Sequence, residues 1–172
     1  MKAQQVNHAF EPVFDQNSRI LVLGTMPSPA SRQNGFYYSH PRNRFWPVVA
    51  QLLAEPLPAT PEEKRSLLLR HGVALWDVLA SCTIAGAEDS SIRRPVANDL
   101  RPILQAAPIA AVFTTGGKAH QLYRRHCLPH TGIEDIPLPS TSPANCRIGT
   151  QELLTAYGQM LNYLETKGEM NG

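Results

Sequence analysis

The sequence predicts an α/β protein, a three-layer α/β/α sandwich around a central four-stranded parallel sheet. Four short apolar runs predict strands buried on both faces, at residues 19–24, 73–78, 109–113 and 133–139. Segments with helical spacing or helix-capping residues lie between these runs. Strands that alternate with helices are typical of a parallel sheet that is covered on both faces.

The first half of the chain contains two predicted helices between its strands. Residues 1–18 predict an irregular N-terminal lead-in. A helix follows Asn43 and ends near Pro56. A second helix begins with Thr60, which is suited to cap it and is followed by a proline and two acids, and it ends at Gly72.

The second half continues the alternation after one long loop. Residues 81–97 are polar and show no periodicity, which predicts a loop. A short helix begins at Asn98, and further helices are expected over 118–126 and 150–166, the last of them amphipathic. Because the sequence shows neither a repeat nor a linker, the whole chain, residues 1–172, is expected to form one domain.

Composition indicates a globular protein of ordinary domain size. The 172 residues include 42% apolar and 17% charged residues, which excludes an intrinsically disordered chain. The formal net charge of +2 permits nucleic-acid binding without arguing for it. Any basic surface therefore has to come from clustering of the charges.

The three cysteines, Cys82, Cys127 and Cys146, are far apart and include no C-x-x-C spacing. They supply neither a disulfide framework nor a zinc ligand set, and an iron–sulfur cluster usually needs four thiolates. The sequence also shows no apolar segment of signal-peptide or membrane-spanning length. We therefore expect a cytoplasmic, nucleoid-associated protein with no metal, no cofactor and no membrane partner.

The residues of most chemical interest follow the first predicted strand. The strand breaks at Gly24 in the loop GTMPSP, and an aromatic triplet, Phe36-Tyr37-Tyr38, precedes the polar segment 39–43, SHPRN. A strand that ends in a glycine–proline loop and leads into a helix is where open α/β sheets place their ligand. The gathered aromatic and polar side chains predict a pocket at this point.

These motifs carry a resemblance to a known family. GTMPS followed by GFYYSHPRNRFW resembles the uracil-DNA glycosylase superfamily, and HP-x-NRFW is similar to its mismatch-specific uracil/thymine branch. Together with the later ALWDVL and PSTSPAN, the pattern most resembles the hypoxanthine-DNA (deoxyinosine) glycosylases. The likeness covers roughly residues 19–165, with five pieces in the same order.

The resemblance implies a monofunctional DNA glycosylase of base excision repair. Such an enzyme hydrolyses the N-glycosidic bond of deaminated bases, with hypoxanthine favoured here and uracil also allowed. The partner it implies is double-stranded DNA containing a deaminated base, bound by a monomer without a cofactor. The enzyme has to hold the base outside the helix, stabilise the departing anion and place a water on C1′.

The first motif is the loop that follows Gly24. In the superfamily's G-x-[DN]-P motif the third residue orients the attacking water, but here that residue is Met26, which accepts hydrogen bonds poorly. Gly24 and Pro27 keep the shape of the loop. The resemblance assigns substrate contacts to Gly24, Thr25, Met26 and Pro27, and a DNA contact to Ser28. Without the later motifs, a plain strand-to-helix turn would be the favoured interpretation.

The second motif is the polar segment, and Asn43 is its predicted catalytic residue. The resemblance implies that an asparagine at this position replaces the missing water-positioning group. Its alternative role is a helix cap, for which asparagine is well suited, and one residue can do both. Phe36 or Tyr37 is expected to stack on the flipped base, with His40 as a further substrate contact. The alternative for the aromatic triplet is a place in the core.

The third motif is the turn TTGGK at residues 114–118. Relatives often carry an asparagine here that reads the edge of the base, and Thr115 (or Thr114) takes its place, which puts pyrimidine selection in doubt. Open backbone N–H groups at Gly116 and Gly117, next to Lys118, predict a seat for a DNA phosphate. A purely structural glycine turn is the alternative.

The fourth motif is the loop STSPAN at residues 140–145. It resembles the superfamily's H-P-S-P loop, and Ser140 stands where the leaving-group histidine would be, as a second candidate catalytic residue. DNA contacts are assigned to Ser142, Pro143, Ala144, Asn145 and Arg147, since such loops wedge into the duplex. The alternative is an ordinary proline-rich loop.

Two further groups of residues remain ambiguous. Asp77 and the segment 89–92 could line the pocket, although a cap on the next turn is the favoured interpretation of Asp77. The arginine pairs Arg93-Arg94 and Arg124-Arg125 could contact phosphates or simply lie in solvent.

Two other classes of function are alternatives to catalysis. A non-catalytic glycosylase-like domain that binds nucleic acid or a nucleotide would explain the substituted motif residues. An esterase is excluded, because neither G-x-S-x-G nor a Ser-His-Asp trio is present. The aromatic and polar segment at residues 36–46 favours the glycosylase, because a binding scaffold has no need of it.

Overall fold

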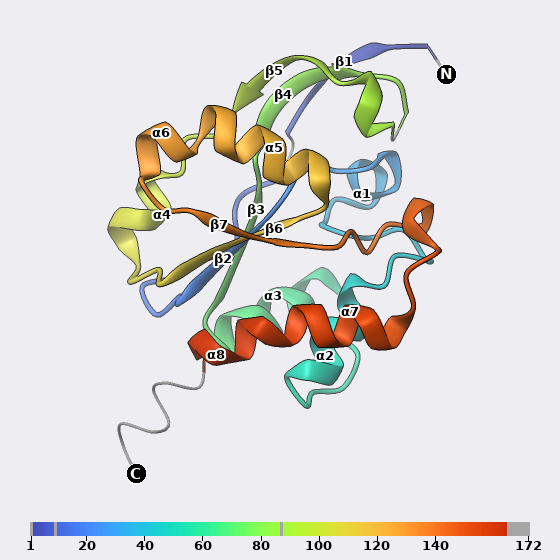
Figure 1. The fold of residues 1–172 in the computed structure, drawn as a ribbon. Helices are drawn as coiled ribbons and strands as arrows, with labels where there is room; N and C mark the ends of the chain where they lie inside the picture. The colour runs from blue at the N-terminus through green and yellow to red at the C-terminus, as the bar shows by residue number, and fades with distance from the viewer. Residues whose placement is uncertain (1, 9, 87, 165–172) are drawn as a thin grey trace.

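The computed structural model describes residues 2–8, 10–86 and 88–164 (Figure 1). Its centre is a parallel sheet of four strands in the order β3-β2-β6-β7. The strands are β2 (Ile20–Gly24), β3 (Val73–Asp77), β6 (Ala111–Thr115) and β7 (Asp135–Leu138). Helices lie on both sides of this sheet, so the predicted α/β architecture around a four-stranded parallel sheet is confirmed.

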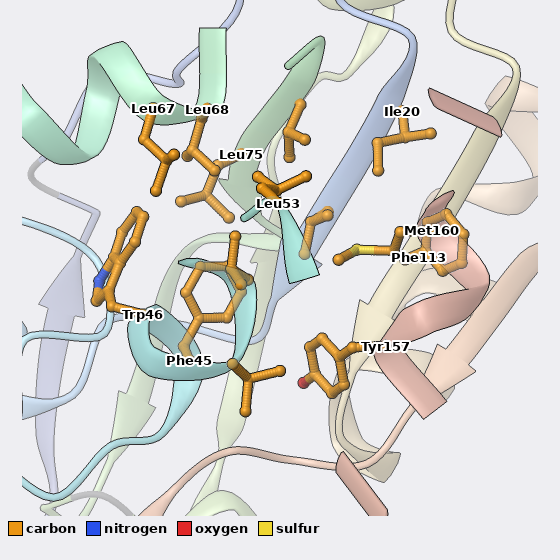
Figure 2. Close-up of a cluster of buried hydrophobic side chains, with 14 of the residues drawn as sticks. Ile20, Phe45, Trp46, Leu53, Leu67, Leu68, Leu75, Phe113, Tyr157 and Met160 are labelled. Atoms are coloured by element: carbon orange, nitrogen blue, oxygen red, sulfur yellow. The ribbon is translucent and has the colours of Figure 1, made fainter. Parts of the chain in front are cut away.

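Strand β2 alternates its side chains between two apolar layers. Ile20 and Val22 belong to the cluster formed with α2 (Phe45–Leu52), α3 (Pro61–Arg70) and α7 (Thr150–Tyr157) (Figure 2). Leu21 and Leu23 face the other cluster, together with α4 (Arg101–Ala106) and α5 (Gly117–His126). All four side chains are completely buried. Burial on both faces explains the uninterrupted apolar run in the sequence.

The register of the sheet brings four strand ends to one edge. Gly24 pairs with Asp77, Leu23 pairs with Thr114, and Thr115 pairs with Leu138. The loops after β2, β3, β6 and β7 therefore leave the sheet side by side, which is the usual position of a ligand site in an open parallel sheet.

A second sheet corrects two of the predictions. Residues 81–97 were expected to form a loop, but β4 (Leu79–Ile84) and β5 (Arg93–Ala97) lie there. They form an antiparallel sheet with β1 (Gln4–Asn7), in the order β1-β4-β5, so the irregular lead-in was also wrong for these four residues. The register of β4 and β5 shifts twice, and such irregularities hide the alternation by which a half-buried strand is identified.

The predicted helices are present, although the last one is interrupted and two short helices are additional. Thr60 caps α3 by accepting a hydrogen bond from the Glu63 N–H at 3.1 Å, as predicted. The helix expected over 150–166 is instead divided into α7, the 3₁₀ turn η3 (Gly158–Met160) and α8 (Leu161–Leu164), and residues 165 and 166 lie outside the described part. Two short helices were not predicted, α1 (Pro29–Asn34) and α6 (Leu128–Thr131). None of the described helices is long and apolar enough to cross a membrane.

The cluster in Figure 2 predicts where truncation is costly. Leu75 on β3 is completely buried in it, whereas Leu57 is 61% exposed. Leu75→Ala should lower the free energy of unfolding by about 2–5 kcal/mol, because it leaves a cavity. Leu57→Ala should change it by less than about 0.5 kcal/mol. Urea titrations of both variants test this, and equal midpoints would contradict the burial described here.

Candidate active site

Three side-chain oxygens converge on Gly24 at the end of β2. A methyl carbon added to this glycine would lie 2.5 Å from Asp77 Oδ1, 2.9 Å from the Tyr38 hydroxyl and 3.6 Å from Thr115 Oγ1. Gly24 is therefore required for its lack of a side chain, which leaves the space the oxygens occupy. The structure thus brings together two residues predicted for the site, Gly24 and Thr115.

Asp77 is fixed by a histidine from the N-terminal segment. His8 Nε2 donates to Asp77 Oδ2 at 2.8 Å, and the two side chains are only 4% and 5% exposed. The other ring nitrogen, His8 Nδ1, accepts from the Phe10 N–H at 3.2 Å, which identifies a neutral imidazole. Oδ1 of Asp77 forms no hydrogen bond within the described residues. The favoured interpretation of Asp77 as a turn cap was therefore wrong, since the carboxylate lies at the strand-end site.

Tyr38 lies at the site, although stacking on the base was predicted only for Phe36 or Tyr37. Its hydroxyl lies 2.9 Å from Thr115 Oγ1, and its ring stacks on Phe45 with centroids 4.0 Å apart. Burial, and then the charge of Asp77, raise the pKa of this hydroxyl well above its usual range, so that it remains a hydrogen-bond donor. Its backbone has φ of +53°, which is unusual for a bulky residue and is most often found at functional sites.

The other members of the aromatic triplet pack elsewhere. Tyr37 is 2% exposed, and its hydroxyl donates to the Glu11 carbonyl at 2.8 Å. Its ring is part of the core, which is the alternative role given for the triplet. Phe36 is half-buried and stacks on Trp46 at 6.1 Å. The residue types do not distinguish these three aromatic side chains. The backbone conformation of the triplet determines which ring lies at the site.

Asn43 lies at the entrance of helix α2, with its side chain half-buried. Its Oδ1 accepts from the Phe45 N–H at 2.9 Å, which satisfies one of the free N–H groups of the first helical turn. The polar segment is held by a bond from the Asn43 N–H to the His40 carbonyl and by one from the Arg42 N–H to His40 Nδ1. A carbonyl oxygen has two lone pairs, so the capping bond leaves Oδ1 one further acceptor position.

Arg44 joins the polar segment to the fourth motif. Its backbone N–H donates to the Thr141 carbonyl at 3.1 Å, and its guanidinium donates to the carbonyls of Asn145 and Ile148. The 140–148 loop is also held from within, because Asn145 Nδ2 donates to the Ser140 carbonyl at 2.9 Å. The loop that carries Ser140 is therefore fixed beside Asn43 by a set of partly buried hydrogen bonds.

The Thr115 turn and the Ser140 loop are also neighbours. A methyl carbon at Gly116 would lie 3.4 Å from Ser140 Cβ, and φ of +97° at Gly116 is a conformation that favours glycine. The Gly116 N–H donates to the Leu138 carbonyl at 2.8 Å. The expectation that this N–H is open to a phosphate was therefore wrong, and Gly117 at the start of α5 is left as the candidate.

The remaining predicted residues have mostly local contacts in the structure. Ser28 caps α1, because its side chain accepts a hydrogen bond from the Ser31 N–H. Pro27 is buried, and the backbone carbonyl of Thr25 accepts from the Leu79 N–H. Met26 packs against the second apolar cluster. On the outer loop, Ser142 Oγ accepts from the Ala144 N–H, Pro143 begins the 3₁₀ turn η2 (Pro143–Asn145), and Arg147 is exposed. Within the described residues, no three histidine, cysteine or acidic side chains come together as a metal site.

Comparison with known proteins identifies the family. The sequence profile of the uracil DNA glycosylase superfamily matches residues 11–162. The chain belongs to the uracil DNA glycosylase superfamily. The hypoxanthine DNA glycosylase of Methanosarcina acetivorans is 33% identical to this glycosylase over 143 residues, 83% of this chain and 90% of that protein. The hypoxanthine DNA glycosylase of Methanosarcina barkeri is 33% identical over 139 residues, 80% and 87% of the two chains.

A solved structure supports the same assignment. The solution NMR structure of a candidate uracil DNA glycosylase from Methanosarcina acetivorans superposes with a TM-score of 0.76 at 29% identity. The match covers 92% of this chain and 99% of the other. The protein is therefore a hydrolase, a DNA glycosylase of this superfamily, and DNA is its substrate class.

The close approach at Gly24 gives the glycosylase a testable constraint. Gly24→Ala would force Asp77 and Tyr38 apart, so we expect overpacking to cost about 1–3 kcal/mol of stability, together with at least a tenfold loss of glycosylase rate. Gly158→Ala is the matched control, because its added carbon meets nothing within 4 Å. Thermal melts and single-turnover assays check both variants. Unchanged activity in Gly24→Ala would show that the three oxygens play no part in catalysis.

Proposed function

We propose that this glycosylase removes deaminated bases from double-stranded DNA, with hypoxanthine as the favoured base and uracil as a second substrate. It acts as a monofunctional, monomeric enzyme that hydrolyses the N-glycosidic bond without a metal or cofactor. The observation that carries the proposal is the set of oxygens from Asp77, Tyr38 and Thr115 around Gly24, at the sheet edge where the four motif loops meet. The similarity to two hypoxanthine DNA glycosylases supports the choice of base.

The chemistry of these oxygens suits a deaminated base. Hypoxanthine and uracil present a ring N–H beside a carbonyl, whereas adenine and cytosine present a bare ring nitrogen beside an amino group. Asp77 Oδ1 is an acceptor for the ring N–H. Thr115 Oγ1 donates to the Leu23 carbonyl at 3.4 Å, so the Tyr38 hydroxyl donates to Thr115 when no base is bound. On binding, the Tyr38 hydroxyl turns to donate to the carbonyl of the base. A site built to form both bonds rejects a base that leaves them unpaired, because buried polar groups without partners are costly.

The same groups support the departure of the base. Negative charge develops on the leaving base as the bond to C1′ breaks, and preorganised donors stabilise that charge. The Tyr38 hydroxyl is such a donor. The Ser140 hydroxyl is a second one: its Oγ accepts from the Ser142 N–H at 3.1 Å, which leaves its proton available for donation. Asn43 orients the attacking water through its free acceptor position. With Met26 apolar, the loop after β2 supplies no side chain for this role.

An assay with single-lesion duplexes tests the proposed activity. End-labelled duplexes carry one deoxyinosine, deoxyuridine, deoxyadenosine or deoxycytidine at the same position. We expect strand breakage after alkali at deoxyinosine, more slowly at deoxyuridine, and none at the two normal nucleosides. Breakage without alkali would contradict a monofunctional enzyme. A gel shift without any breakage would replace catalysis by the binding-only alternative.

The role of Asn43 is tested by separating its cap from its contact with water. Asn43→Ala removes both, so we expect a loss of at least about 10²-fold in single-turnover rate and about 1 kcal/mol of stability. Asn43→Ser keeps a hydroxyl that can accept from the Phe45 N–H but is too short to hold the water. It should retain the stability and lose the rate. If serine restores both, Asn43 is only a helix cap.

A further inference from the structure

A positively charged groove lies between β5 and α5, and its lining includes none of the residues whose oxygens surround Gly24. Figure 1 labels both elements. It encloses about 390 Å³. Its lining residues are Ile92, Arg93, Arg94, Pro95, Lys118, Gln121, Leu122, Arg125 and His126. Four of them are permanently positive and none is acidic, in a chain whose formal net charge is only +2. We call this feature the basic groove.

A bulge in β5 lets two consecutive arginines line the groove. Neighbouring residues of a regular strand point to opposite faces of the sheet. Here Ser81 pairs with Val96 and Thr83 with Arg93, so the interval on β5 holds one residue more than the interval on β4. Arg94 within it has φ of +53°, an unusual value for arginine. Bulges re-aim side chains, and this one brings Arg93 and Arg94 to the same groove.

The other wall is one face of helix α5. Lys118, Leu122 and Arg125 are spaced by four and three residues, which places them on a single side of the helix. Lys118 and Arg125 are seven positions apart, so the positive charges extend over about 10 Å along the axis. Lys118 directly follows Gly117, so the groove begins beside the Gly116–Gly117 turn of the candidate active site.

The cations of the groove differ from arginines nearby in having no acidic partner. Arg124, next to Arg125 on α5, pairs with Glu134 at 3.4 Å, and Arg101 pairs with Asp99 at 2.9 Å. Within the described residues no carboxylate forms an ion pair with Arg94 or Arg125. Arg93 donates only to backbone carbonyls, those of Ser90 and Ile92. Lys118 differs from these arginines, because its positive charge interacts at longer range with the Asp89 carboxyl.

We propose that the basic groove binds the phosphodiester backbone of the duplex that flanks the excised base. The proposal rests on the DNA glycosylase assignment. A row of unpaired cations about 10 Å long matches roughly three phosphates of one strand, which follow each other every 3.4 Å along the helix axis. The lining contains no tyrosine, phenylalanine or tryptophan, so it offers no platform for the unstacked bases of a single strand.

The salt dependence of binding tests the groove. The double variant Arg94→Gln/Arg125→Gln removes two of the proposed phosphate contacts. The probe is a labelled duplex with a tetrahydrofuran abasic-site analogue and about one helical turn of DNA on each side. Between about 50 and 200 mM KCl, the slope of log affinity against log salt should become shallower by about 1.8, and affinity at 100 mM should fall roughly tenfold or more.

The matched control is Arg101→Gln/Arg124→Gln, which removes the same charge from two arginines that are already paired with acids. Its slope should remain that of the wild type. Equal slopes for all three proteins, or equal losses in both variants, would overturn the groove proposal. Lesion cleavage by the wild type is measured in parallel. If the wild type cleaves a lesion and the salt slopes of the three proteins are equal, only the groove proposal is refuted. No cleavage of any lesion, with the slopes still different, refutes the proposed function and leaves the groove.

Discussion

Everything at the candidate active site depends on how closely polar side chains can approach the backbone of β2 at Gly24. The strand before it is buried on both faces, so its end cannot shift without disturbing two apolar layers. The neighbouring strands are held in register with it, and they place Asp77 and Thr115 beside the glycine. The rigid apolar sheet thus fixes the distances between the oxygens of the site. Side chains on strands are positioned more precisely than side chains on loops.

The candidate active site and the basic groove differ in charge. Asp77 is a buried carboxylate beside a neutral histidine, and its desolvation has to be offset by the bond from His8 and by the nearby hydroxyls. A negative group at this position disfavours a phosphate beside Gly24. The cations of the basic groove lie instead on β5 and α5. In the proposed function, the base and the backbone of one nucleic acid are therefore directed to different surfaces of the protein.

Much of this arrangement could be predicted from the sequence, because it depends on local patterns. The run of apolar residues in β2 predicted the central strand, and Thr60 predicted the start of α3. The strands of the antiparallel sheet were missed, and in β4 and β5 the reason is that register shifts break the period of two. Asp77 and Tyr38 were undervalued for a different reason. The partner of Asp77 is 69 positions away, and Tyr38 is selected among three aromatic residues by a backbone conformation that its type rarely adopts.

The pairing of His8 with Asp77 also has a consequence for the internal dynamics of the protein. His8 immediately follows β1, a four-residue edge strand of which only Val6 is buried. Short, exposed edge elements open at a lower free energy than the core to which they are attached. Each local opening of β1 would withdraw the imidazole and expose the carboxylate to water, while the parallel sheet stayed folded. The electrostatic environment of Gly24 is thus coupled to the fraying of an edge strand that belongs to the other sheet.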